Sequence, residues 1–225
     1  MKLRLGLIGL GPLWESRYRP ALRALSDRFQ VTAVFEQVAH RAVTAAREFD
    51  ASPVSGVRAL AQRADVDAVL LLSKQWMGTL PIFAAADAGK AIYCANHLDL
   101  QHDEAERLRT RVNDAGIAFM SELPRRHAPA TIRLKELIAT KLGKPHLLFG
   151  HIRRPSERRP TGKPHAWSPP PHESPLADLV EQVDWVRYVV GREPTSVIGL
   201  THRAFTDPGR QDYEMMSVDF SPVGE

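Results

Sequence analysis

Residues 3–14 read "LRLGLIGLGPLW" and join an apolar run to a pair of glycines. The run Leu3–Ile8 has the composition of a buried strand, and Gly9 and Gly11 follow it where a helix is expected to begin at Leu13. Glycines at such a junction let the backbone turn tightly and approach a pyrophosphate, whose negative charge is favoured by a helix N-terminus. The stretch therefore predicts the first strand, turn and helix of a nucleotide-binding α/β domain.

Four neighbouring side chains modify this motif. Trp14 stands where the usual fingerprint has its third glycine, and Pro12 removes one N–H donor. Glu36 ends the second apolar run, where a carboxylate can bind the ribose hydroxyls of an adenine nucleotide and repel a 2′-phosphate. This position favours NAD over NADP, although Arg41 nearby would weaken the preference. The alternative interpretation is a sheet whose glycines serve only the turn.

The first half of the chain alternates strands and helices. Strands are expected at 3–8, 31–36, 66–72, 91–94 and 117–121, and helices at 13–28, 39–49, 78–88 and 102–115. Repeated alternation with short connections predicts a doubly wound parallel sheet of the Rossmann type. We assign it to a dinucleotide-binding domain over residues 1–122.

The pattern changes from Leu123 onward. Helices are expected at 128–142 and 175–190, and strands at 145–154, 195–205 and 213–220. Helices followed by neighbouring strands, without alternation, predict an α+β domain on an antiparallel sheet. We assign residues 123–225 to a short domain for substrate binding and dimerisation.

Composition excludes several classes of protein. Cys94 is the single cysteine, which excludes an internal disulfide and a Cys-based zinc cluster. No apolar run reaches the length of a membrane span. The N-terminal stretch lacks the long apolar core and cleavage site of a signal peptide. These observations predict a cytoplasmic protein with no membrane partner.

A basic, proline-rich segment occupies residues 151–175. It holds five Lys or Arg and two Glu, a net charge of +3, and seven of the seventeen prolines. Proline removes ladder donors, so an extended loop is expected. A basic loop can bind nucleic acid, but Trp167 is its single aromatic residue, and a solvated surface loop is favoured. The histidines of the chain have no spacing typical of metal ligands, so no metal site is predicted.

The chain resembles the Gfo/Idh/MocA family of nicotinamide-dependent oxidoreductases. The resemblance runs from residue 5 to about residue 220. Its carriers are "GLIGLG" at 6–11, "RPAL" at 19–22, "VTAVFE" at 31–36, "DVDAVLLLS" at 65–73, "AADAGKAIYCANHLDL" at 85–100 and "PRRHAPA" at 124–130. The resemblance implies a Rossmann domain that binds NAD(P), a sugar or polyol-like substrate, and a homodimer formed through the C-terminal sheet. The cofactor would contact Gly9, Gly11, Pro12, Leu13, Glu36, Arg41, Leu72, Ser73 and Ala95.

Catalytic positions of the family differ in this chain. Where the family usually reads E-K-P, with the lysine between nicotinamide and substrate, the chain has Ala95, Asn96 and His97. Asn96 can orient a hydroxyl but cannot exchange a proton at neutral pH. His97 has a suitable unperturbed pKa near 6.5, but neighbouring strand residues point to opposite faces. Lys74 could replace the lost lysine; the alternative is a surface lysine.

A second departure lies on the expected helix 175–190. The family usually carries Asp, His and Asp at i, i+4 and i+7, and aligned on "VVGREP" these positions are Ala177, Glu181 and Asp184. Glu181 could act as a general base, or could be an exposed residue of an amphipathic helix. Arg125 and Arg126 match paired basic residues of the family, and either face an anionic substrate or cap the sheet.

Three functional hypotheses follow. The first is an NAD(P)-dependent oxidoreductase acting on a polyol, sugar or related alcohol or carbonyl, with proton transfer by Glu181, His97 or Lys74 and orientation by Asn96. The second is a catalytically impaired relative, a ligand- or cofactor-sensing module that binds protein and in which no cofactor need be bound. Nucleic-acid binding through the basic segment is a distant third.

Overall fold

The computed structural model describes residues 1–73, 77–95, 98, 100–151, 175–202 and 213–220. The chain divides into two units, Met1–Leu123 and Pro124–Glu225, each of which is described by itself. In the described part of the chain, no helix has the length and apolar character needed to cross a membrane. The functions expected of the two domains, dinucleotide binding and substrate binding with dimerisation, stay predictions.

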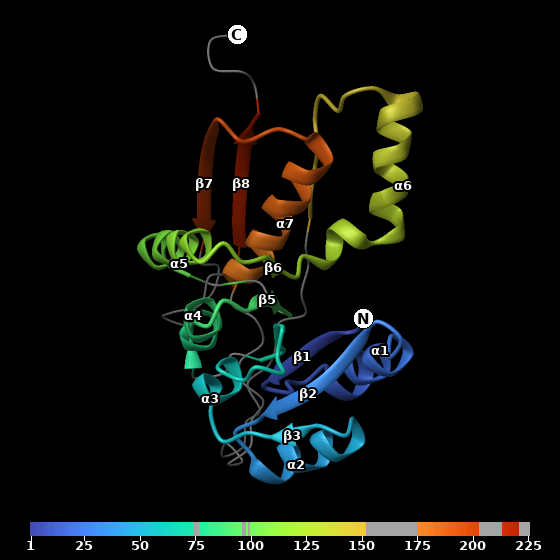
Figure 1. Cartoon of the computed structure of the whole chain (residues 1–225). Coiled ribbons are helices and arrows are strands. Elements are labelled where there is room, and N and C mark those ends of the chain that lie inside the picture. The colour runs from blue at the N-terminus through green and yellow to red at the C-terminus, as the bar shows by residue number, and fades with distance from the viewer. Residues whose placement is uncertain (74–76, 96–97, 99, 152–174, 203–212, 221–225) are drawn as a thin grey trace, which may run out of the picture. The chain divides into compact units, whose positions relative to one another are not determined.

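The first unit is built on a six-stranded parallel sheet (Figure 1). Its strands are β1 (Leu3–Ile8), β2 (Phe29–Phe35), β3 (Ser52–Pro53), β4 (Ala68–Leu71), β5 (Ala91–Cys94) and β6 (Phe119–Ser121), in the order β3-β2-β1-β4-β5-β6. Its α-helices include α1 (Arg19–Ala24), α2 (Ala39–Glu48), α3 (Val57–Ala61), α4 (Leu80–Asp87) and α5 (His102–Asp114). This order reverses between β1 and β4, as in a doubly wound Rossmann sheet, and confirms the expected fold class.

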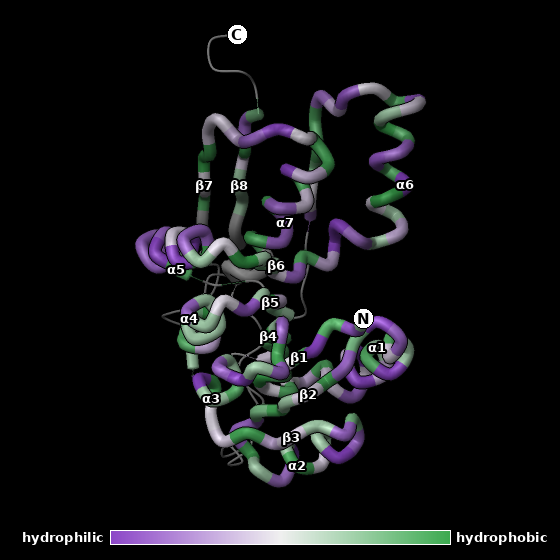
Figure 2. Tube along the Cα trace, viewed as in Figure 1, coloured by the Kyte–Doolittle hydropathy of each residue, from purple (hydrophilic) through white to green (hydrophobic). Residues whose placement is uncertain are grey.

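Alternate residues of the central strands bury both faces of this sheet. On β1, Leu5 and Leu7 pack with Leu22 of α1, whereas Ile8 belongs to a second apolar cluster with Leu60 of α3. The hydropathy colouring accordingly shows apolar central strands and a mostly hydrophilic α5 (Figure 2). Strands covered on both faces read as near-continuous apolar runs, which is why periodicity located them in the sequence.

The first helix differs from the one expected at 13–28. It begins as a π-helix, η1 (Trp14–Tyr18), in which the N–H groups of Arg17 and Tyr18 both donate to the carbonyl of Leu13, at 3.0 and 3.2 Å. It continues as α1 and ends at Ala24, because the following residues turn into β2. The expected helix was therefore too long, and regular only in its second half.

Two short elements were missed by the sequence analysis. Strand β3 has two residues and helix α3 has five. Neither is long enough to produce a recognisable hydrophobic period. Both nevertheless contribute to the first unit, because β3 extends the sheet beyond β2 and α3 supplies the buried Leu60.

The second unit contains helices and one antiparallel strand pair. Its elements are η3 (Pro124–His127), α6 (Pro129–Leu137), the π-helix η4 (Ile138–Leu142), α7 (Pro175–Val190), β7 (Ser196–His202) and β8 (Tyr213–Asp219). Strands β7 and β8 pair antiparallel, from Ser196 opposite Asp219 to His202 opposite Tyr213. The α+β class with an antiparallel sheet is thereby confirmed, while the strand expected at 145–154 is wrong over residues 145–151, which are irregular.

Helices α6 and α7 are joined by polar contacts. The indole N–H of Trp185 donates to the hydroxyl of Thr131 at 2.9 Å, and the ammonium of Lys135 donates to the carbonyl of Tyr188 at 2.9 Å.

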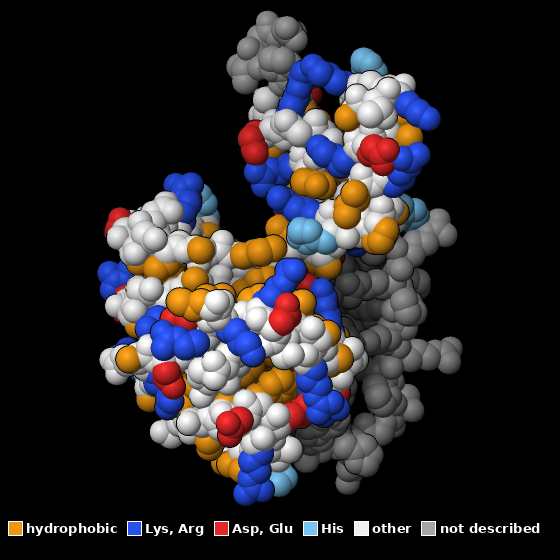
Figure 3. Space-filling model, turned by 45° about the vertical axis from the view of Figure 1, so that its right-hand side comes forward, with side chains coloured by type: hydrophobic (Ala, Val, Ile, Leu, Met, Phe, Trp, Pro, Cys, Tyr) orange, Lys and Arg blue, Asp and Glu red, His pale blue; other side chains and the backbone are white. Residues whose placement is uncertain are grey.

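On the face shown in Figure 3, Lys and Arg side chains are scattered among hydrophobic ones. The basic segment 152–174 lies outside the described residues.

Candidate functional site

The glycine turn after β1 lies against the end of β4. Gly9 and Gly11 have positive φ angles of 66° and 63°, a region that favours glycine. A Cβ on Gly9 would lie 2.4 Å from the carbonyl oxygen of Ser73, and one on Gly11 would lie 2.8 Å from that of Leu72. Both glycines are therefore required by conformation and by backbone approach, at the point where the strand order reverses.

Glu36 ties this turn to the end of β2. Its side chain is buried at 4% exposure, and one carboxylate oxygen accepts a hydrogen bond of 2.7 Å from the N–H of Leu10. The other oxygen accepts a long bond of 3.5 Å from the N–H of Val38. A carboxylate has about four acceptor positions, so Glu36 keeps capacity for a ribose diol. Arg41 lies exposed on α2.

Trp14, in place of the third glycine, is part of the core. Its ring packs against that of Phe49, with centroids 5.9 Å apart, and it joins the apolar cluster on the α1–α2 face of the sheet. Pro12 and Leu13 remain exposed at the turn. The indole therefore lies in the core of the first unit, and the positive-φ glycines and the carboxylate fit the adenosine and pyrophosphate part of a dinucleotide.

The carboxyl ends of β4 and β5 continue the same edge of the sheet. Leu72 and Ser73 follow β4, Ala95 follows β5, and all three are buried. The N–H of Leu72 donates to Ile8 and that of Ala95 to Leu71, both at 2.9 Å, so the ladder extends past the strand ends. The expected catalytic residues Lys74, Asn96 and His97 lie outside the described residues.

A polar cluster around the buried carboxylate of Glu122 stands at the same edge and was missed by the sequence analysis. It consists of Arg17 and Tyr18 of η1, Tyr93 of β5, and Glu122, which follows β6. Burial and the nearby carboxylate of Glu122 raise the pKa of Tyr93 to about 12. Burial and a hydrogen bond to Glu122 likewise raise the pKa of Tyr18 above its usual value. Sequence separations of about a hundred residues left no local pattern that could have identified it.

In the second unit, η3 and α7 are joined by two ion pairs. Arg125 donates to Glu181 at 3.1 Å, and Arg126 donates to Asp184 at 2.7 Å. The guanidinium of Arg126 also lies 5.3 Å from the ring centroid of Tyr188, and the hydrogen bonds that it donates to Asp184 raise the pKa of Arg126. Both arginines are thus engaged by α7, an arrangement different from the two weighed in the sequence analysis. Glu181 is half-buried and paired, and the side chain of Ala177 lies outside the described part.

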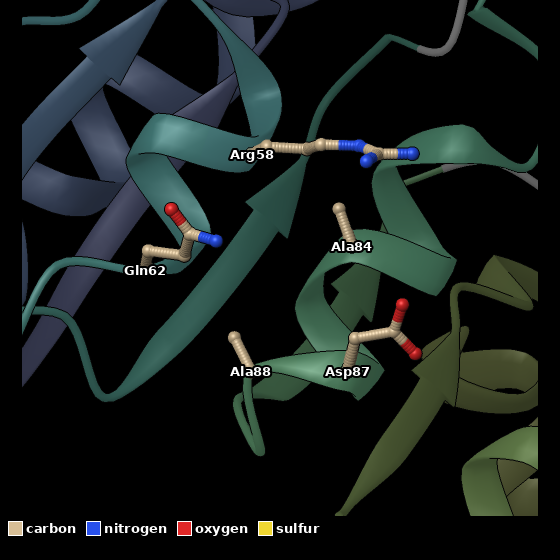
Figure 4. A pocket seen from close by; sticks show the side chains of 5 residues that line it. All are labelled: Arg58, Gln62, Ala84, Asp87 and Ala88. Carbon is tan, nitrogen blue, oxygen red and sulfur yellow. The ribbon is translucent and has the colours of Figure 1, made fainter.

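A hollow between α3 and α4 has a different character (Figure 4). It is lined by Arg58, Gln62, Ala84, Asp87 and Ala88 and encloses about 120 Å³. Ligand pockets usually enclose roughly 300–1,000 Å³, so it is too small for a dinucleotide. Gln62 and Ala88 cap the carboxyl ends of α3 and α4, whereas Arg58 lies in the first turn of α3. No group of His, Cys, Asp and Glu suited to a metal occurs among the residues described.

Comparison with known proteins assigns the family. Residues 3–123 match the model of the GFO_IDH_MocA oxidoreductase family, which has an NAD-binding Rossmann fold. The match covers more than half of the chain, and the chain belongs to this family. An inositol 2-dehydrogenase of Cereibacter sphaeroides is 27% identical over 97% of this chain and 64% of its own length.

Solved structures agree on the fold. A probable dehydrogenase from Thermotoga maritima superposes with a TM-score of 0.73 at 20% identity, over 97% of this chain and 65% of that one. A 3-ketoreductase from Actinomadura kijaniata, in complex with NADP and TDP-benzene, gives 0.57 at 28% identity, over 64% and 44%. The chain spans between 41% and 64% of the length of the first curated relatives that it matches.

Proposed function

We propose that the chain is an NAD(P)-dependent oxidoreductase that transfers hydride to or from a polyol, a sugar or a related alcohol or carbonyl. The observation that carries this proposal is the turn at Gly9 and Gly11, tied to the buried carboxylate of Glu36 at the carboxyl ends of β1 and β2. The similarity to an inositol 2-dehydrogenase and a 3-ketoreductase supports the substrate class.

NAD is favoured over NADP. The carboxylate of Glu36 is held by the N–H of Leu10, so it cannot swing away from a 2′-phosphate without breaking that bond. An adenine ribose with free hydroxyls can instead donate to it. The ketoreductase relative binds NADP, so the preference must be tested on this chain.

The decisive experiment is calorimetric titration with NADH and, separately, NADPH. We expect micromolar binding of NADH and at least about tenfold weaker binding of NADPH, because two like charges would meet at Glu36. Glu36→Gln keeps an acceptor for the N–H of Leu10 but removes the negative charge. It should therefore reduce the ratio between the NADPH and NADH dissociation constants. Glu106 on α5, whose side chain is 43% exposed, gives the control Glu106→Gln, which should leave the ratio of the two dissociation constants unchanged. Failure of both nucleotides to bind at millimolar concentration would overturn the proposal.

Proton transfer in such an enzyme is assigned to Glu181, His97 or Lys74, with Asn96 orienting the substrate. A bound nicotinamide would supply the hydride acceptor for alcohol oxidation, and a protein group must take the hydroxyl proton as the carbonyl forms. Turnover on a panel of polyols and sugars should fall in Glu181→Gln if Glu181 is the base. The control is Glu193→Gln, which removes the same charge from an exposed ion pair with Arg187.

A non-catalytic role is the second candidate, and the pairing of Glu181 with Arg125 favours it. The Glu181 oxygen that accepts from Arg125 can take a proton from a substrate hydroxyl only if this hydrogen bond is broken. A sensing module would bind NADH with the affinity described above, yet show no turnover on the panel. Binding of NADH without any NAD⁺ reduction on the panel by the unsubstituted protein would therefore select the sensing role.

A homodimer through β7 and β8 is also proposed. Ile198 and Leu200 of β7 and Met215 of β8 alternate onto one face of the pair and are exposed there. Sedimentation of the protein should report a dimer that Ile198→Asp converts to a monomer. The control Ile132→Asp alters a similarly exposed isoleucine on α6 and should leave the dimer intact.

A further inference from the structure

The buried carboxylate of Glu122 occupies an unusual place at the edge of the parallel sheet. Glu122 follows β6 and is 5% exposed. Its N–H donates to the carbonyl of Cys94 at 2.8 Å, so its backbone extends the ladder between β5 and β6. A buried carboxylate is costly unless it is paired and hydrogen-bonded. The hydrogen-bond and ion-pair partners of Glu122 therefore indicate the role of this carboxylate.

Both partners come from the π-helix that follows the glycine turn. The guanidinium of Arg17 forms an ion pair with one oxygen of Glu122, and the hydroxyl of Tyr18 donates to the other at 2.6 Å. A bond from a hydroxyl to an ionised carboxylate is short and strong. The phenol of Tyr18 is consequently held in one place, at the carboxyl end of the sheet.

That place is next to the backbone of Ala95. The hydroxyl oxygen of Tyr18 lies 3.3 Å from the carbonyl oxygen of Ala95, as a second and weaker acceptor. The N–H of Ala95 is already bonded to Leu71 of β4 at 2.9 Å. Ala95, the residue that follows β5, is thus held by the sheet on one side and by Tyr18 on the other.

The position of β5 in the sheet relates this contact to the expected cofactor site. A dinucleotide crosses a doubly wound sheet at the switch point, here between β1 and β4. Glu36 at the end of β2 marks the side of the adenine ribose. The other half of the dinucleotide, which carries the nicotinamide, is then expected over the ends of β4 and β5.

We infer that Tyr18, held by Glu122 and Arg17, is a positioning residue that fixes the carboxyl end of β5 for the nicotinamide half of the cofactor. This inference rests on the proposed dinucleotide binding. Tyr18 acts through the carbonyl of Ala95 and does not itself touch the cofactor. Its removal should therefore alter one half of the cofactor site and leave the other half unchanged.

The test compares NADH with ADP-ribose, which keeps the adenosine and the pyrophosphate but lacks nicotinamide. In Tyr18→Phe we expect NADH to bind about fivefold more weakly, as for one lost hydrogen bond, with ADP-ribose affinity within about twofold of the unvaried protein. The matched control is Tyr93→Phe, which removes the same atom beside the same carboxylate but leaves the Tyr18 contact. It should change neither affinity by more than about twofold.

Two variants of Glu122 test whether the hydrogen bond from Tyr18 is what NADH binding requires. Glu122→Gln retains an oxygen that can accept from Tyr18, and should bind NADH more tightly than Glu122→Leu, which cannot accept a hydrogen bond. Glu122→Leu should, like Tyr18→Phe, weaken the binding of NADH and leave the binding of ADP-ribose nearly unchanged. Hydrogen exchange of the peptide that carries Ala91–Cys94 should be faster in Tyr18→Phe and Glu122→Leu, and unchanged in Glu122→Gln.

The outcomes separate the two proposals. If the unvaried protein binds neither NADH nor ADP-ribose, the proposed function is wrong and the inference falls with it. If the unvaried protein binds both, and Tyr18→Phe weakens neither or weakens both equally, the inference alone is overturned, because equal weakening is what a general loss of structure would cause.

Discussion

The two units of the chain bury their apolar side chains very differently. In the first unit, the side chains on both faces of the parallel sheet form two apolar clusters. In the second, among the residues described, Val189 is the one fully buried aliphatic side chain, while Phe149 is 87% exposed. Ion pairs and polar bonds join η3 and α6 to α7 instead. Burial contributes about 25 cal/mol per Å², so the first unit should be much the more stable of the two.

The largest effect should come from removing apolar volume from the first unit. Leu60 is 0% exposed, whereas Leu147 in the second unit is 75% exposed. Leu60→Ala should lower the free energy of unfolding by about 3 kcal/mol, through lost burial and a cavity. Leu147→Ala should change it by less than about 0.5 kcal/mol. Peptide-resolved hydrogen exchange in denaturant measures both, and equal effects would contradict the comparison.

A second pair of variants tests backbone approach. Gly9 and Gly191 have similar positive φ angles, 66° and 71°, but a Cβ meets the backbone of Ser73 at the first and open space at the second. Gly9→Ala should cost about 2 kcal/mol or more, and Gly191→Ala about 1 kcal/mol, the strain of the left-handed conformation alone. Thermal unfolding of the two variants would detect the difference. Equal costs would mean that β4 retreats from the glycine turn without penalty.

In the second unit, which buries few apolar side chains, the ion pair with the more buried carboxylate should contribute more to stability than the exposed one. Arg126→Gln leaves the buried carboxylate of Asp184 without its main partner, and should destabilise α7 by about 1 kcal/mol. Arg187→Gln breaks an exposed pair with Glu193 and should cost less than about 0.5 kcal/mol. Hydrogen exchange along α7 compares them, and the Arg126 effect should diminish little at high salt. A larger effect for Arg187 would show that burial of Asp184 is unimportant.

The smallest effect concerns acid stability of the first unit. The guanidinium of Arg4 donates to both oxygens of Asp67 and lowers the pKa of this carboxyl to about 2. Since the folded-state pKa lies below the unfolded value, the contribution is present above about pH 4 and is lost as pH falls toward 2. The free energy of unfolding should therefore decline between these values, and the decline should be smaller in Asp67→Asn, where the lowered pKa of Asp65 still contributes. The exposed Asp27 provides the control Asp27→Asn, which should keep the decline.

Regular elements with strong hydrophobic patterns were predictable from the sequence. Leu3–Ile8 and Pro175–Val190 have the bounds that were expected. The first helix was not predictable, because a π-helical turn has no period that distinguishes it from an α-helix in so few residues. The irregular course of residues 145–151 was missed because a short apolar run does not itself supply a strand partner.

The site was predictable where it is local and unpredictable where it is assembled from distant segments. The glycine turn and Glu36 were located because each follows a strand that the sequence reveals. The bonds from Arg17 and Tyr18 to Glu122 were not, since their partners are more than a hundred residues apart. The roles of Lys74, Asn96 and His97 stay predictions, because these residues lie outside the described part of the chain.

The π-helix has a consequence for insertions and deletions. Its wide turn holds one residue more than an α-helical turn would need. Deleting Ser16 would rotate Tyr18 by about 100° around the helix axis relative to the glycine turn, although every side chain of the polar cluster would still be present. The deletion variant should therefore show the same split between NADH and ADP-ribose as Tyr18→Phe. The length of one turn, as much as the identity of its residues, thus determines where the tyrosine hydroxyl lies.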